Sequence, residues 1–255
     1  MKILLVNDDG VFAPGINALA RALKKKHDVV MVAPASERSG FSQSLTYMSP
    51  IKAEKVTLQG NEDVEAYAVS GSPADCAKFG VRHVMKWDVD VVISGINNGF
   101  NIGTDIYYSG TVGAATEAVM FGVPAIAVSQ RRSKTDEIDF DFAAEYIASF
   151  LETADIKSLP PRTLLNINFP IDPEKGIKGT KITSQGVLEY NEYYEKIEGE
   201  KDTYRLKGKL ELDPPEGTDF HAVLNGYVSV SALKYDRTDY LCDKILETMI
   251  GGSNG

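Results

Sequence analysis

A short apolar run near the start of the chain ends at two adjacent carboxylates. Ile3 to Val6 is continuously apolar, and Asp8, Asp9 and Gly10 follow almost at once. A run of this kind is typical of a strand buried on both faces, as in the centre of a parallel sheet. Ligands of open α/β sheets bind at the carboxyl ends of the strands, which is where Asp8 and Asp9 stand. Because adjacent carboxylates repel each other, this position favours a bound cation, although an exposed Asp-Asp-Gly turn would explain the same residues.

The order of the apolar segments predicts the fold class. Further buried strands are expected to end at Pro34, next to Ser94 and at Val128, with helical patterns between them. Strands that alternate with helices are the signature of a mainly parallel sheet. We therefore predict an α/β fold, with a Rossmann-like core over residues 1–184 that carries helices on both faces of its sheet. The helical patterns before residue 184 begin near Pro14, Pro73, Val112 and Phe140.

The composition of the chain changes after residue 184. Residues 185–225 are rich in Tyr, Glu and Lys and contain few apolar runs, which indicates an extended β-rich hairpin or arm. Residues 226–255 carry one more strand, a closing helix and a tail expected to fray from residue 251. Since the arm has too few apolar residues for a core of its own, we expect its tyrosines to pack against a partner subunit. A mobile, solvated hairpin is the alternative.

The bulk composition excludes several kinds of partner. The chain has 255 residues, of which 43% are hydrophobic, and a net charge of −9. Electrostatic binding to a nucleic acid polymer or to an anionic membrane is therefore not expected. A phosphorylated small substrate stays possible, because a bound divalent cation reverses the local charge. No apolar stretch is long enough to span a membrane and no signal peptide is recognisable before the first strand, so we predict a cytoplasmic protein.

Hard oxygen donors follow three of the predicted parallel strands. Asp8 and Asp9 follow the first strand, Ser39 lies in the loop after the second, and Asn97 follows a later one. Because parallel strands end at the same edge of a sheet, we expect these side chains to meet. Such donors suit magnesium, manganese or calcium better than zinc. The loop at Ser39 is equally compatible with an ordinary turn.

A loop rich in glycine and asparagine leads into a helix of small residues. Glycines recur at every fourth position over residues 95–103, a pattern that favours backbone N–H groups turned toward a ligand. Ser109, Gly110 and Thr111 stand at the start of the helix, where free backbone donors and the helix dipole favour an anion. The chain lacks the dinucleotide fingerprint, the P-loop and the serine-hydrolase elbow, which favours metal-assisted chemistry.

Five motifs, in this order along the chain, resemble those of the SurE family, the stationary-phase survival proteins. They cover residues 7–10 with 13–15, residues 33–34 through 38–40, residues 71–76, residues 94–105 and residues 108–112. A later stretch, residues 226–230, fits as well. The resemblance implies a metal-dependent phosphatase that hydrolyses nucleoside 5′-monophosphates, with 3′-monophosphates and short polyphosphate as further substrates. It also implies a homodimer or homotetramer built with C-terminal elements.

The resemblance also assigns residues to the site. It implies one divalent cation per subunit, Mg²⁺ or Mn²⁺ with Ca²⁺ as an alternative occupant, held by Asp8, Asp9, Ser39 and Asn97. It implies a phosphate pocket formed by Asn101, Ser109, Gly110 and Thr111. We expect Asp8 or Asp9 to act as the catalytic acid–base group, with a covalent phosphoryl intermediate on Asp8 as the alternative. Two other functions stay open, a non-catalytic nucleotide or metabolite binder and a metal-dependent glycosyltransferase-like enzyme.

Overall fold

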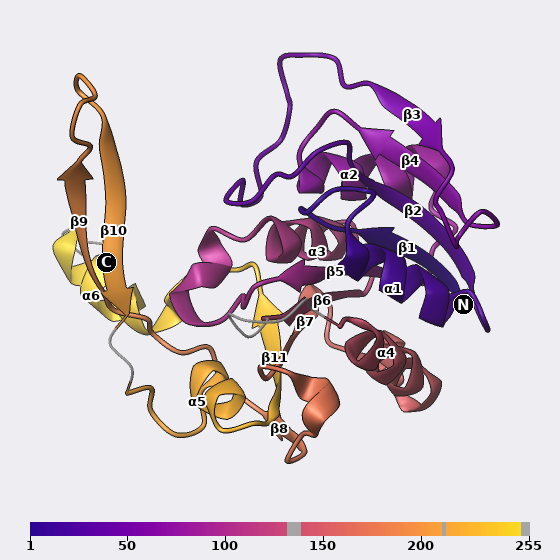
Figure 1. Cartoon of the computed structure of the whole chain (residues 1–255). Coiled ribbons are helices and arrows are strands. Elements are labelled where there is room, and N and C mark those ends of the chain that lie inside the picture. Colours follow the sequence, from indigo (N-terminus) through magenta and orange to yellow (C-terminus); the bar gives the residue numbers. More distant parts are fainter. Residues whose placement is uncertain (132–138, 211–212, 251–255) are drawn as a thin grey trace.

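A nine-stranded sheet forms the centre of the computed structural model, which describes residues 1–131, 139–210 and 213–250 (Figure 1). Its strands lie in the order β3-β4-β2-β1-β5-β6-β7-β11-β8. The central strands pair in parallel, whereas β3 and β11 run antiparallel to β4 and β7. The strands are β1 Lys2–Val6, β2 Asp28–Pro34, β3 Ala53–Val56, β4 Glu65–Val69, β5 Val91–Asn98, β6 Ala125–Gln130, β7 Thr163–Phe169, β8 Thr180–Ile182 and β11 Val228–Lys234. The predicted Rossmann-like, mainly parallel sheet is confirmed.

Helices cover both faces of the sheet. On one face α1 (Pro14–Leu23) and α4 (Asp141–Thr153) bury their apolar side chains against β1, β5 and β7. On the other face α2 (Pro73–Phe79) and α3 (Gly110–Met120) form a second apolar core with the opposite side of the strands. The central strands therefore lie between two cores, which explains why Ile3 to Val6 are fully buried without alternation.

The second helix differs from the prediction at its C-terminal end. The helical spacing over residues 76–85 predicts one continuous helix, but α2 ends at Phe79 and a π-helical turn follows over Gly80–Val84. Its start agrees with the sequence, because Ser72 and Asp75 form a capping box and Pro73 occupies the first turn. The apolar spacing alone does not distinguish an α-helical turn from a π-helical one.

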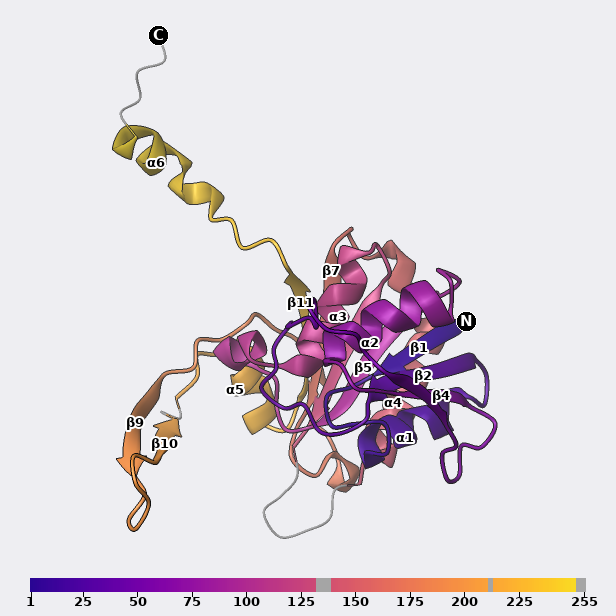
Figure 2. The same cartoon turned by 90° about the horizontal axis from the view of Figure 1, so that it is seen from above.

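The C-terminal part contains a separate hairpin and a projecting helix. Strands β9 (Tyr190–Lys196) and β10 (Tyr204–Leu210) pair only with each other, and β9 is exposed along its whole length. Helix α6 (Asp243–Met249) stands away from the body at the end of an extended segment, in a different direction from the hairpin (Figure 2). Residues 251–255, for which fraying is predicted, lie outside the described residues.

The hairpin is shorter than the arm predicted over residues 185–225. Leu188, before β9, and Phe220 of the short helix α5 (Asp219–Leu224) are both buried in a small apolar cluster with Ile102. These residues pack onto the body of the protein because each side chain finds an apolar neighbour there. Of the predicted arm, the tyrosine-rich hairpin of β9 and β10 is the part that projects from the body (Figure 1).

Candidate active site

The turn after β1 is closed by an asparagine that the sequence motif contains. Asn7 Nδ2 donates to the carbonyl of Gly10 at 2.9 Å, and Asn7 Oδ1 accepts from the Gly10 N–H at 3.2 Å. Asn7 is fully buried, so these bonds replace the water that its carboxamide loses on folding. The turn therefore has a fixed shape, and it carries Asp8 and Asp9 at the carboxyl end of the strand.

Backbone hydrogen bonds bring the loop after β2 and the end of β5 to the same place. The N–H of Arg38 donates to the Asp8 carbonyl at 2.7 Å, which holds the loop that contains Ser39. The N–H of Asn98 donates to Asp9 Oδ2 at 3.2 Å, which ties the end of β5 to the second carboxylate. The ends of three parallel strands thus converge on the carboxylate pair.

The N-terminus of α3 packs directly against Asp8. Thr111 Oγ1 donates a hydrogen bond to Asp8 Oδ1, so the first turn of the helix contacts the carboxylate. A Cβ atom on Gly110 would lie 2.8 Å from Asp8 Cβ and 3.1 Å from Asp8 Oδ2. Only glycine permits this close approach, which places the start of the helix beside Asp8.

A main-chain contact sets the spacing between α1 and the end of β5 that carries Asn97. Gly15, in the first turn of α1, faces the carbonyl of Ile96 so closely that a Cβ atom would lie 2.0 Å from that oxygen. Strand β5 therefore lies directly on the backbone of α1, next to the turn that carries the carboxylates, and Asn97, which the sequence predicts to follow the strand, belongs to the strand itself.

The two carboxylates are held in an environment that disfavours their charge. Burial raises the pKa of Asp8, although the hydrogen bond from Thr111 acts in the opposite direction. Burial and the charge of Asp8 raise the pKa of Asp9 to about 6, and the carboxylate of Glu37 contributes further. No ion pair in the described part of the chain joins Asp8 or Asp9 to a basic side chain. Asp8 is buried and Asp9 is half-buried, and without such a partner the pair fits a site for a divalent cation.

The other two predicted metal ligands lie at the edge of this site. Ser39 is exposed, and its hydroxyl donates to Glu37 Oε1 at 2.8 Å. Asn97 is half-buried, and its Nδ2 donates to the carbonyl of Gly99 at 3.0 Å. Since this bond uses the nitrogen of the carboxamide, the oxygen is left for another partner. Within the described residues, no group of three or more His, Cys, Asp and Glu side chains forms a metal cluster, so a cation here needs neutral oxygen ligands as well.

Three of the predicted phosphate ligands have structural partners. Ser109 is the N-cap of α3, and its hydroxyl accepts from the Val112 N–H at 3.0 Å. Asn101 is buried, and its Nδ2 donates to Ser129 Oγ at 2.8 Å. Thr111, through its bond to Asp8, is likewise tied to the carboxylates. The sequence motifs predict phosphate binding as the only role of these side chains, because a sequence does not show which hydrogen bonds they form within the protein.

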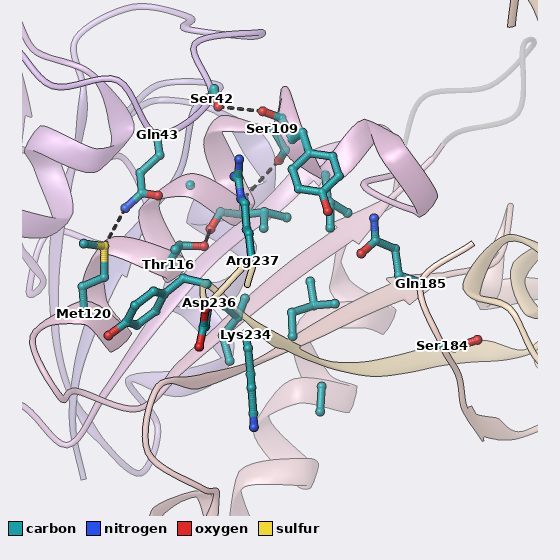
Figure 3. Close-up of a pocket in the computed structure, with 18 residues that line it drawn as sticks. Ser42, Gln43, Ser109, Thr116, Met120, Ser184, Gln185, Lys234, Asp236 and Arg237 are labelled. Atoms are coloured by element: carbon teal, nitrogen blue, oxygen red, sulfur yellow. Dashed lines mark hydrogen bonds between the residues drawn. The ribbon is translucent and has the colours of Figure 1, made fainter. Parts of the chain in front are cut away.

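A cavity of about 720 Å³ opens beside the site (Figure 3). Ser109 and Thr116 of the α3 segment, Gln43 of the loop after β2, and Arg237 from the chain after β11 contribute to its lining. Asp8 and Asp9 do not line it. The cavity therefore adjoins the carboxylate site on the side of the α3 N-cap and is separate from the predicted metal position.

Sequence reasoning missed Asn7 and Glu37 as parts of the site. Asn7 stands in the first motif, and its position three residues before Gly10 is the available sequence signal for the turn that it closes. Glu37 stands two residues before Ser39 and adds a third negative charge near the pair. No pattern in the sequence distinguishes Glu37 from the many surface glutamates.

Comparison with known proteins agrees with the motifs. The model of the family "Survival protein SurE" matches residues 3–192. Two relatives named 5′-nucleotidase SurE, from Thermoanaerobacter sp. (strain X514) and Fervidobacterium nodosum, are 43% and 45% identical; the matches cover 97% and 98% of this chain and 98% of each relative. The crystal structure of the SurE protein from Aquifex aeolicus superposes with a TM-score of 0.84 at 38% identity, covering 98% of this chain and all of that one. By fold, by motif and by overall sequence, this chain is a member of the SurE family.

Proposed function

We propose that the chain is a metal-dependent 5′-nucleotidase that hydrolyses nucleoside 5′-monophosphates to nucleoside and phosphate. One observation carries the proposal: in the described part of the chain the adjacent carboxylates of Asp8 and Asp9 form no ion pair with a basic side chain, and Asp8 lies against the N-terminus of α3. A cation site next to an anion site is the arrangement that phosphate ester hydrolysis needs. The names of the relatives supply the nucleotide as the substrate class.

The residues for the cation are those that the motifs identify. Asp8 and Asp9 would hold one divalent cation per subunit, with Ser39 and Asn97 as neutral ligands. Magnesium or manganese fits this set of hard oxygen donors, and calcium is an alternative occupant. When bound, such a cation withdraws charge from phosphorus and lowers the pKa of a bound water.

The protein groups would position the substrate and move the proton. Gly110 and Thr111, at the start of α3, lie against Asp8, so they would bind non-bridging phosphate oxygens beside that carboxylate. Negative charge that develops on these oxygens would meet donors already in place. Asp8 or Asp9 would accept the proton of the attacking water, and nucleophilic attack by Asp8 is the alternative route.

The proposal also covers the oligomeric state of the protein and its location in the cell. The exposed tyrosines of β9 and β10 and the exposed apolar side chains of α6 support a homodimer or homotetramer with these elements at its interfaces. In the part of the chain that the structure describes, no helix is both long and apolar enough to cross a bilayer. We also propose that the enzyme is cytoplasmic. Its further proposed substrates are nucleoside 3′-monophosphates and short polyphosphate.

The test is a substrate panel measured with and without a chelator. The panel contains nucleoside 5′- and 3′-monophosphates, short polyphosphate and an aryl phosphate, each with magnesium, manganese or calcium. We expect hydrolysis of the 5′-monophosphates that chelation abolishes and that added metal restores. Nucleotide binding without phosphate release under every condition would instead favour the non-catalytic binder.

A further inference from the structure

Buried polar side chains on β6 and β7 hold the loop that carries Asn101. The backbone N–H of Asn101 donates to Asn168 Oδ1 at 2.9 Å. Its carbonyl accepts from Asn166 Nδ2 at 2.8 Å and from Asn168 Nδ2 at 3.0 Å. Its own Nδ2 donates to Ser129 Oγ at 2.8 Å. Four hydrogen bonds thus fix one residue of the loop between β5 and α3, in both backbone and side chain.

The two asparagines of β7 stand where a strand normally carries apolar residues. Every residue of β7 is buried. Leu165 and Ile167 face the core of α1 and α4, whereas Leu164, on the other side of the strand, packs in the core of α3. Since side chains alternate along a strand, Asn166 and Asn168 share the α3 side with Leu164. Both carboxamides therefore lie on the face of the sheet that supports the active-site loop.

The hydrogen bonds of these asparagines are directed at the loop. Burial of a carboxamide is unfavourable unless its polar atoms find partners. Within the described residues, Asn166 Oδ1 has no partner, so the bond to Asn101 is the only hydrogen bond that this side chain makes. Both hydrogen bonds of the Asn168 side chain also go to Asn101, one to its N–H and one to its carbonyl.

We propose that Asn166, Asn168 and Ser129 are positioning residues, which orient Asn101 toward the substrate phosphate without touching the substrate themselves. The inference rests on the proposed function, because that function is what places a phosphate next to Asn101. It extends the site to strands β6 and β7, which contribute none of the predicted ligands.

A double-mutant cycle between Ser129 and Asn101 tests the inference. Ser129→Ala removes the acceptor of the Asn101 side chain and deletes only one oxygen, so the variant is expected to fold. We expect KM for adenosine 5′-monophosphate to rise roughly threefold to tenfold, the range of a single neutral hydrogen bond, with kcat changed less than twofold. In the Asn101→Ala background, Ser129→Ala should not change KM further, because Ser129 acts on the substrate only through the Asn101 side chain.

A buried serine on β11, two strands away from Ser129 in the sheet, provides the matched control. Ser231 on β11 is 1% exposed, and its hydroxyl bonds to Thr183 Oγ1 at 2.8 Å, away from Asn101. Ser231→Ala should lower thermal stability about as much as Ser129→Ala does and leave KM unchanged. If Ser129→Ala and Ser231→Ala have the same kinetic constants, or if Ser129→Ala and Asn101→Ala act additively on kcat/KM, the positioning role is wrong.

Amide hydrogen exchange separates this inference from the proposed function. The Asn101 N–H should be protected in the intact protein, and Asn168→Ala should accelerate its exchange at least tenfold while peptides from β1 and β2 keep their protection. This result does not depend on turnover. An intact protein that hydrolyses no nucleotide would therefore refute the proposed function, but not the hydrogen bonds by which Asn166, Asn168 and Ser129 hold Asn101. Unchanged exchange at Asn101 in Asn168→Ala would refute the positioning role itself.

Discussion

Thr111 Oγ1 donates a hydrogen bond to Asp8 Oδ1, so a polar contact joins the first turn of α3 to the turn that follows β1. The contact joins the element proposed to bind phosphate to a carboxylate proposed to bind the cation. It favours the ionised form of Asp8 and so opposes the effect of burial on the pKa of that carboxyl.

Replacement of Thr111 should therefore alter cation binding as well as phosphate binding. Thr111→Val keeps the shape of the side chain and removes the donor, which raises the pKa of Asp8 further. We expect the dissociation constant for Mn²⁺ at pH 7 to rise roughly tenfold, the effect of one hydrogen bond to a charged group. Titration calorimetry measures the change, and Thr111→Ser, which keeps the hydroxyl, is the control. Normal Mn²⁺ affinity in Thr111→Val would show that Thr111 does not affect cation binding and would restrict its role to phosphate binding.

Loss of either carboxylate should remove the cation and stabilise the metal-free protein. In Asp8→Asn and Asp9→Asn, the cation loses a charged ligand and the remaining acid loses a repulsive neighbour. We expect nucleotidase activity to fall at least 100-fold at saturating metal, with a higher Tm than the wild type in chelator. Calorimetric scans and initial rates give both quantities. Near-normal turnover by either variant would contradict its assignment.

The raised pKa of Asp9 predicts a pH dependence of stability. The pKa of this carboxyl is about 6 in the folded protein, against an ordinary value of 3.8. Since folding favours the protonated form, the stabilising contribution is fully present below the ordinary value and is lost as the pH rises through 6. We expect the Tm advantage of metal-free Asp9→Asn over the wild type to be small at pH 4 and to grow up to pH 7. A difference that does not depend on pH would show that Asp9 does not titrate in this range.

Ser109 should contribute to helix stability as well as to substrate binding. Its hydroxyl is the N-cap of α3, so Ser109→Ala should lower the free energy of unfolding by about 1 kcal/mol, whereas Ser109→Asp should retain the cap. If Ser109 also binds phosphate, both variants should raise KM, and the aspartate should do so more strongly because it repels the anion. Urea denaturation together with KM measurements separates the two roles. An unchanged KM in Ser109→Asp would restrict Ser109 to capping.

The tyrosine hairpin should determine the oligomeric state. Tyr193, Tyr194 and Tyr204 are each more than half exposed, although their rings favour burial. We expect light scattering to show a homo-oligomer, and replacement of residues 190–210 by a short Gly-Ser turn to give a smaller species that still binds Mn²⁺. Replacement of the same tyrosines by serine in the intact hairpin is the milder control. A monomeric wild type at micromolar concentration would leave the hairpin without an interface role.

The fold and the position of the site follow from features that act locally in the sequence. The apolar run at Ile3–Val6 specifies a central strand, and the acids after it must lie at the ligand-binding edge of the sheet. The start of α3 is equally local, because Ser109 caps the helix and Gly110 follows. These parts could be predicted without any knowledge of which distant residues would touch them.

The remaining features depend on contacts between residues far apart in the chain. Nothing near Asn101 indicates that Asn166 and Asn168 bind its backbone, since strand β7 is more than 60 positions away. Likewise, the bond of Thr111 to Asp8 crosses 103 positions. Hydrophobic periodicity locates strands and helices, but it carries no information on which polar atoms meet across the sheet.

The contact between Gly15 and the carbonyl of Ile96 fixes the distance between α1 and β5. The main chain of the helix rests there on the main chain of the strand, so backbone atoms set the separation and the volume of a side chain does not enter. A Cβ atom at position 15 would force the two elements apart. Even Gly15→Ala is therefore expected to displace the end of β5, where Asn97 and Asn98 stand.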